Sequence, residues 1–329
     1  MLQSPTLVAA EAPADFLDRA MQRVDGVIRA RLSSRVALID QISHYIIEAG
    51  GKRVRPRLVL LFADAFGYDG PARYELAATV EFIHTATLLH DDVVDESSLR
   101  RGRATANAMF GNAASVLVGD FLYSRAFQMM VSVGDMRVLE VLAEATNTIA
   151  EGEVMQLMNM HDPDLATESY LRVIRSKTAK LFEASARLGA ILGRAQPAVE
   201  EACAAYGRSL GTAFQLIDDL LDYEGNSSEL GKNVGDDLRE GKATMPLLSA
   251  MARGTDEERA LLRRAIELGD VQQLPRVLEV VRRTGALELT REAARQEVAL
   301  ASEALQRVPA GRAQQALAQL CAGSIGRTS

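Results

Sequence analysis

Apolar residues recur along almost the whole chain at the spacing of one face of an α-helix, and this periodicity leaves few folds open. Runs that alternate strictly between apolar and polar residues are scarce. Aromatic residues make up only 5% of the sequence, which favours helix over strand. Several expected helices exceed 20 residues without a sustained heptad repeat, so we expect them to bury one another in one large all-α bundle. The expected helices span residues 14–32, 35–49, 53–66, 71–96, 112–134, 136–160, 167–194, 197–225 and 243–253, followed by shorter helices to about residue 322.

The composition narrows the classes of function. No repeat, proline-rich linker or charge block divides the sequence, so we expect residues 1–329 to form a single domain. Apolar residues make up 48% of the chain and charged residues 25%, as in ordinary globular proteins. The net charge of −7 argues against a nucleic-acid partner. An anionic partner must therefore meet local basic groups or a metal ion.

Neither a membrane span nor a secretion signal is expected. The longest run without a charged residue, Ala104 to Gly119, has 16 residues. A bilayer span needs about 20 apolar residues. The N-terminus lacks the cationic start of a signal peptide. The two cysteines, Cys203 and Cys321, are too few for a disulfide framework, so we expect a cytoplasmic protein.

Two clusters of three aspartates share the spacing i, i+1, i+4. On a helix this spacing places the first and third carboxylates one turn apart on one face. Both clusters follow an apolar stretch, so each helix carries its acids at one end of a buried stripe. The clusters are Asp91, Asp92 and Asp95 in LLHDDVVDESS, and Asp218, Asp219 and Asp222 in FQLIDDLLDYEG.

Three neighbouring carboxylates repel one another, and a hard divalent cation with oxygen ligands removes that penalty. Magnesium usually takes one or two carboxylates and completes its octahedron with water and phosphate oxygens. Two facing clusters therefore predict a clamp of three magnesium ions that holds a polyanion, most naturally a diphosphate.

Basic residues gather beside the acidic clusters, in GGKRVRP, LRRGR, SKT, GK and EGKATMP. Only five of the 37 basic residues are lysine, and four of the five adjoin these motifs. Cations beside metal-binding acids on an acidic protein indicate a second anion site that works without metal. The lysines are Lys52, Lys177, Lys180, Lys232 and Lys242.

With DDVVD and DDLLD, the segments GGKRVRP, LRRGRATAN, SKTAKLF, GTAFQLIDDLLDY and GKNVGDDLREGK resemble the trans-prenyl diphosphate synthase family. Long stretches such as EFIHTATLLHDDVVDES and IAEGEVMQLMN are most similar to its bacterial long-chain members, which make the side chain of respiratory quinones. Residues 1–15 and 311–329 carry no recognisable signature. The resemblance implies an antiparallel helical bundle around a deep central cavity, usually assembled as a homodimer.

The resemblance also implies roles for residues. Asp91, Asp95 and Asp218 would be the principal magnesium ligands, with Asp92, Asp219 and Asp222 in support. An allylic diphosphate, expected to be farnesyl diphosphate, would be held by Arg100, Lys177 and Lys232. Isopentenyl diphosphate would be held by Lys52, Arg55, His84 and Arg101, and Thr178 and Gln215 would place dipoles near the reacting carbon.

The implied reaction is the ionisation of the allylic diphosphate, attack by the double bond of isopentenyl diphosphate, and loss of a proton. Magnesium ions neutralise the leaving diphosphate. In this family the released diphosphate acts as the base, which agrees with the lack of any Glu or His that looks poised for that role. An apolar bundle interior keeps water from the cation.

Small residues upstream of Asp91 indicate a long product. In the family, a bulky aromatic four or five residues before the first aspartate blocks the tunnel, and here those positions are Thr87 and Ala86. Ile83 and Thr79 follow on the same side of the helix. We expect a product of about forty to fifty carbons, whose tail is comparable to a helix of about 20 residues. Candidates for the tunnel floor are Phe62, Phe127, Met129 and Met130.

Two alternatives remain open. The chain could be a subunit that needs a partner, although helical partner subunits usually lose acidic motifs that are intact here. It could also be a shorter-chain synthase with products of fifteen to twenty carbons. Release of a greasy product would bring transient contact with a membrane surface, and with a net charge of −7 that contact would be hydrophobic.

Overall fold

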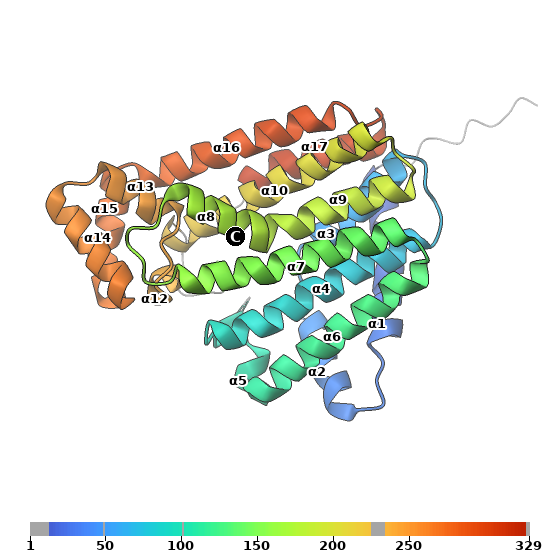
Figure 1. Ribbon diagram of the computed structural model, residues 1–329, viewed down its shortest axis with the longest axis horizontal. Coiled ribbons are helices and arrows are strands. Elements are labelled where there is room, and N and C mark those ends of the chain that lie inside the picture. The colour runs from blue at the N-terminus through green and yellow to red at the C-terminus, as the bar shows by residue number, and fades with distance from the viewer. Residues whose placement is uncertain (1–12, 49, 101, 225–233, 327–329) are drawn as a thin grey trace, which may run out of the picture.

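The computed structural model describes residues 13–48, 50–100, 102–224 and 234–326, and these ranges are almost entirely helical (Figure 1). The all-α class expected from the periodicity is confirmed. The first half contains α1 (Pro13–Leu32), α2 (Ala37–Glu48), α3 (Val54–Ala65), α4 (Ala72–Val94), α5 (Ala106–Phe110), α6 (Asn112–Val133) and α7 (Met136–Met158). The second half contains α8 (Thr167–Ile174), α9 (Lys180–Leu192), α10 (Pro197–Glu224), α12 (Asp236–Arg239), α13 (Met245–Arg253), α14 (Asp256–Leu268), the short 3-10 helix η2 (Val271–Gln273), α15 (Leu274–Arg283), α16 (Ala286–Leu305) and α17 (Arg312–Ile325).

The long helices lie side by side and bury three apolar clusters. In Figure 1, α4, α7, α9, α10 and α16 run along the long axis of the molecule. One cluster joins α1, α4, α6 and α7, and includes Ile83 and Leu122. A second joins α10 to α13–α16. A third joins α3, α9, α10 and α17 around Phe62 and Tyr206, whose rings meet edge to face with centroids 5.5 Å apart. None of the described helices is long and apolar enough to cross a membrane.

The helix expected over 167–194 is divided in two. Between α8 and α9, the residues of η1 (Arg175–Ala179) form a π-helical turn. Such turns insert a residue into the helical repeat and are frequent at functional sites. Helix α7 packs closely on this turn, because a Cβ added to Gly152 would lie 2.8 Å from the backbone nitrogen of Lys177. Buried apolar residues flank the turn on both sides, at Val173 and Ile174 and at Leu181 and Phe182, so the periodicity does not reveal it.

A short hairpin that the periodicity does not predict follows α4. Strand β1 (Leu99–Arg100) pairs antiparallel with β2 (Arg103–Ala104). The hydroxyl of Tyr45 on α2 donates a hydrogen bond of 2.6 Å to the carbonyl of Ala104, and Arg103 stacks over the Tyr45 ring at 4.9 Å. Helix α2 therefore fixes the position of the hairpin.

The expectation of only shorter helices after residue 253 is wrong for α16, which has 20 residues. It packs along α10 with buried small residues such as Ala294 and Ala301. An alanine-rich stripe gives only a weak apolar pattern in the sequence, although it allows close helix packing. The length of α16 is therefore underestimated from the sequence. The final helix, α17, lies within the stretch without a family signature and is tied to α3 by the Arg312–Asp64 ion pair at 2.6 Å.

Candidate active site

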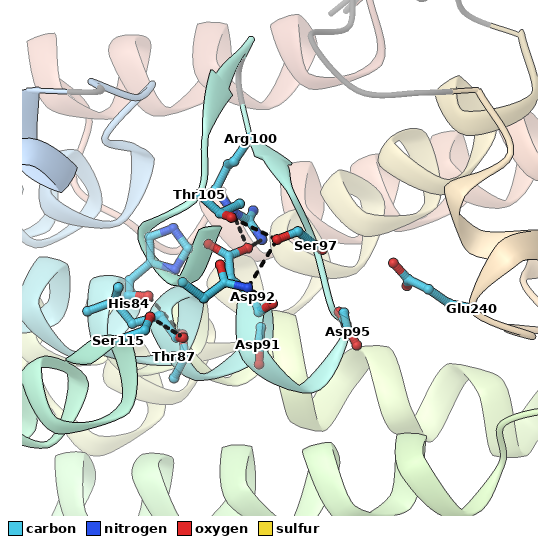
Figure 2. Close-up of polar contacts among 12 residues, drawn as sticks. His84, Thr87, Asp91, Asp92, Asp95, Ser97, Arg100, Thr105, Ser115 and Glu240 are labelled. Carbon is cyan, nitrogen blue, oxygen red and sulfur yellow. Dashed lines mark hydrogen bonds and ion pairs between the residues drawn. The ribbon is translucent and has the colours of Figure 1, made fainter. Parts of the chain in front are cut away.

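The first aspartate cluster lies at the end of α4, beside the β1–β2 hairpin (Figure 2). Asp92 is buried and faces the hairpin, where Arg100 donates to its Oδ1 through Nη2 at 2.6 Å and Nε at 2.9 Å. The amide of Asn107 on α5 donates to the carbonyl of Asp92 at 3.0 Å. The hairpin thus brings a guanidinium to the acidic end of α4.

The other two carboxylates of this cluster face lysines from distant segments. Asp91 Oδ2 lies 3.5 Å from Lys177 Nζ of η1, and Asp95 Oδ2 lies 3.1 Å from Lys242 Nζ. Lys242 also pairs with Glu240, which lies across from Asp95 in Figure 2. Burial raises the pKa of Asp91, and Lys177 opposes that rise. Burial alone would lower the pKa of Lys242, but Asp95 and Glu240 outweigh it and raise that pKa.

The second cluster lies in the last turns of α10. Asp219 is buried and accepts hydrogen bonds from the Tyr170 hydroxyl at 2.5 Å and from Gln215 Nε2 at 2.7 Å. Burial raises the pKa of Asp219 to about 6, and these two donors oppose the rise. Asp222 Oδ2 accepts from the backbone N–H of Asp237 at 3.2 Å, which joins α10 to α12.

A hydrogen-bonded chain orients the two neutral polar residues of the predicted site. Thr178 Oγ1 donates to Gln215 Oε1 at 2.8 Å, and the amide of Gln215 donates in turn to Asp219. The π-turn η1 places Thr178 beside Lys177, so α8–α9 and α10 present their polar groups to the same space.

One cavity of about 860 Å³ brings most of the predicted residues together. Its apolar wall includes Ile149, Leu181, Phe182 and Phe214. A charged end beside an apolar wall can hold a charged head group and a hydrocarbon tail in one continuous space. The predicted residues that line it are Lys52, Arg55, His84, Thr87, Asp91, Asp95, Arg100, Lys177, Thr178, Gln215, Asp218, Asp219 and Asp222.

The basic segment before α3 is held in an unusual backbone conformation. Arg53, the residue before the helix, has φ 47° and ψ 41°, a left-handed conformation that non-glycine residues seldom adopt. Its guanidinium pairs with Asp25 of α1 at 2.7 Å. The neighbouring Arg55 stacks over the ring of Phe182 at 4.4 Å. Lys52 and Arg55 both line the cavity.

The residues predicted to set product length divide between the cavity and the core. Thr87 lines the cavity, whereas Ile83 and Ala86 are fully buried in the cluster between α4 and α6. Thr79 is buried as well, and so are three candidates for the floor: Phe62, Met129 and Met130. The fourth candidate, Phe127 on α6, is 41% exposed in the single chain, so the buried cluster between α4 and α6 does not enclose it.

Three of the residues predicted to bind metal or substrate are not among the described residues that line the cavity. Arg101 and Lys232 fall outside the described residues. Asp92 faces Arg100 and is not part of the cavity wall.

Tyr170 and Glu153 line the cavity but are not predicted from the sequence. Lys242, expected among the cations beside the aspartates but assigned to neither substrate, lines it as well. Burial raises the pKa of Glu153 to about 7, and the negative charge of the nearby Asp91 contributes to the rise. Its only signal was its place in IAEGEVMQLMN.

The donor set suits magnesium. The two clusters offer carboxylate oxygens from α4 and α10 to one cavity, and oxygen is the ligand atom that this ion prefers. Within the described ranges, no three His, Cys, Asp or Glu side chains are arranged to hold a metal ion by themselves. Magnesium in proteins commonly completes its shell with water and phosphate oxygens, so carboxylates from either helix suffice as protein ligands.

Comparisons with known proteins agree with this geometry. The family model described as polyprenyl synthetase matches residues 36–282. Octaprenyl diphosphate synthase of Escherichia coli strain K12 is 58% identical over 290 residues, covering 88% of this chain and 90% of the relative. Octaprenyl diphosphate synthase of Haemophilus influenzae is 48% identical over 327 residues, covering 99% of each chain. The crystal structure of a polyprenyl synthase from Caulobacter crescentus CB15, complexed with calcium and isoprenyl diphosphate, superposes with a TM-score of 0.93 at 45% identity, covering 96% of this chain and 97% of that one.

Proposed function

The chain belongs to the polyprenyl synthetase family and is a prenyltransferase, and we propose that it adds isopentenyl diphosphate repeatedly to farnesyl diphosphate to give all-trans octaprenyl diphosphate. The observation that carries the proposal is the convergence of two aspartate clusters, from α4 and α10, on one cavity that also has an apolar wall. The product would supply the side chain of a respiratory quinone, ubiquinone in particular. Similarity to two octaprenyl diphosphate synthases supports eight isoprene units.

We assign residues to each step of the reaction. Asp91, Asp95 and Asp218 would hold magnesium, with Asp92, Asp219 and Asp222 in support; three ions are proposed with substrate bound. Magnesium, when bound, neutralises charge on the diphosphate group as the allylic C–O bond breaks. Arg100, Lys177 and Lys232 would hold the allylic diphosphate, while Lys52, Arg55, His84 and Arg101 would hold isopentenyl diphosphate.

The chain's remaining task is to protect and direct the allylic cation. Thr178 and Gln215, oriented by the hydrogen bond between them, present oxygen dipoles to the cavity. The double bond of isopentenyl diphosphate attacks the cation, a new C–C bond forms, and a proton passes to the released diphosphate. Ile149, Leu181 and Phe214 form an apolar wall that excludes water from the cation.

Product analysis tests this proposal. Purified protein is incubated with magnesium, farnesyl diphosphate and labelled isopentenyl diphosphate, and the dephosphorylated products are sized by chromatography. A single peak at forty carbons is expected. A peak at fifteen or twenty carbons would show that the tunnel is shorter than proposed. No incorporation would contradict an enzyme that works alone and would direct attention to a partner subunit.

We also propose a homodimer that works in the cytoplasm and touches a membrane surface when product leaves. Support for the dimer comes from apolar side chains exposed on α6 and α7, including Leu117, Val131 and Met158. Both cysteines are buried free thiols, as suits a reducing compartment.

A further inference from the structure

The ammonium of Lys177 lies between two carboxylates with different tasks. Lys177 Nζ is 2.5 Å from Glu153 Oε2 and 3.5 Å from Asp91 Oδ2. Asp91 belongs to the first aspartate cluster, whereas Glu153 comes from α7 and belongs to neither cluster. The closer carboxylate is therefore the one with no proposed part in metal binding.

Local packing holds this arrangement in place. Gly152 allows α7 to approach the backbone of η1, where an added Cβ would meet Lys177 nitrogen at 2.8 Å and Ser176 Cβ at 2.9 Å. The side chains of Lys177 and Glu153 are only 17% and 30% exposed, so water screens their attraction weakly. Glu153 directly follows Gly152 on α7, so the contact of Gly152 with η1 also fixes the position of Glu153 relative to Lys177.

A lysine beside a metal-binding carboxylate competes with the metal. If Glu153 lacked its charge, Lys177 would be attracted chiefly to Asp91 and would approach the oxygen that a divalent cation needs. A lysine ammonium has three donors, so one bond to Glu153 leaves others for a diphosphate oxygen. Glu153 therefore gives the Lys177 ammonium a carboxylate partner that is not a proposed metal ligand.

We propose that Glu153 is a positioning residue: by taking the closer contact with the ammonium of Lys177, it leaves that ammonium in a longer ion pair with Asp91, which keeps Asp91 available to magnesium and aims Lys177 at the allylic diphosphate. This inference rests on the proposed function of the two aspartate clusters. Glu153 acts through Lys177 and does not itself touch the reacting atoms.

The test compares Glu153→Gln with Glu151→Gln, its matched control. Glu151 lies on the same helix, is exposed and accepts a hydrogen bond from Asn147. Binding of Mn²⁺ in the presence of inorganic diphosphate is followed by the electron paramagnetic resonance signal of the free ion. Steady-state rates then give the half-saturating magnesium concentration and a KM for each substrate.

We expect E153Q to raise the half-saturating metal concentration and the KM for farnesyl diphosphate by about tenfold, in keeping with the loss of a hydrogen bond to a charged group. The KM for isopentenyl diphosphate should stay within about twofold, and saturating magnesium should largely restore kcat. Glu153→Asp keeps the charge and should lie closer to the wild type than E153Q. E151Q should match the wild type.

Two results would overturn the inference. In the first, E153Q lowers only the melting temperature and leaves metal binding and both KM values unchanged, which is a purely structural effect. In the second, E153Q loses metal binding at every concentration, which would make Glu153 a ligand. Mn²⁺ binding decides between these outcomes without turnover, so a failure of wild type and E151Q to incorporate isopentenyl diphosphate would count against the proposed function alone.

Discussion

The pKa of Asp219 is set by two opposing effects, burial and hydrogen bonding. Burial favours its neutral form and raises its pKa to about 6, while hydrogen bonds from Tyr170 and Gln215 favour the charged form. Because its folded-state pKa exceeds the usual aspartate value, the group stabilises the fold most at low pH. That contribution to the free energy of unfolding declines as pH rises through about 6.

Removing the Tyr170 hydroxyl should move the pH dependence of activity. In Tyr170→Phe, Asp219 loses a donor to its charged form, so its pKa rises further and the acid limb of the kcat profile shifts upward. A shift of about one to two pH units is expected, since such a hydrogen bond contributes about 1.5–3 kcal/mol and one unit equals about 1.4 kcal/mol. The control is Tyr206→Phe, whose hydroxyl donates to the Leu317 carbonyl in the third apolar cluster. An unmoved limb in Y170F would contradict this coupling.

A second residue-scale prediction separates two neighbouring positions. Thr87 lines the cavity and Ala86 is buried against α6, so Thr87→Phe should shorten the product with little loss of stability. Ala86→Tyr should instead overpack the core and lower stability by about 1–3 kcal/mol. Chromatography of the products and urea unfolding measure the two effects. Full-length product from T87F would show that the tail does not pass Thr87.

At the scale of elements, apolar periodicity predicted the long helices well because burial of one face decides where they form. The expected helices at 71–96, 136–160 and 197–225 correspond to α4, α7 and α10. The π-turn η1 and the β1–β2 hairpin escaped prediction because tertiary contacts produce them: Gly152 docks on the turn, and Tyr45 anchors the hairpin.

The same limit applies to the candidate site. Spacing and family motifs identified the aspartates and most of the lysines, but Glu153 is one acid among many on helical surfaces until α7 is placed against η1. Whether Thr87 or Ala86 faces the cavity also depends on how α4 is rotated about its own axis, and the sequence of two adjacent residues does not determine that rotation.

The close approach of α7 to η1 is itself testable. In Gly152→Ala, the new methyl group would meet backbone atoms of η1, so the two elements must separate and displace Lys177. We expect a stability loss of about 1–3 kcal/mol with reduced activity. Gly26→Ala on α1 has no atoms within 4 Å of the added Cβ and should instead stabilise the helix by about 0.5–1 kcal/mol. Equal effects of the two substitutions in urea unfolding and rate assays would argue against a special role for Gly152.

At the scale of the whole molecule, the proposed dimer predicts that one exposed apolar face matters more than another. Leu117 on α6 is 66% exposed, and Leu268 on α14 is 63% exposed. Leu117→Glu should reduce the mass in solution from twice 35.6 kDa toward one chain, because a charge cannot be buried there without a partner. Leu268→Glu should leave the mass unchanged. Light scattering after size exclusion measures both, and a dimer that survives L117E would place the interface elsewhere.

The packing of α17 on α3 also bears on how the chain acquires its structure. Phe62 and Leu61 near the N-terminus share an apolar cluster with Leu317 and Cys321 near the other end. During synthesis, that face of α3 stays open until the segment around residues 317–321 has left the ribosome. Pairing of such distant segments slows folding and prolongs exposure of apolar surface. The nascent enzyme should accordingly be a client of chaperones until α17 packs against α3.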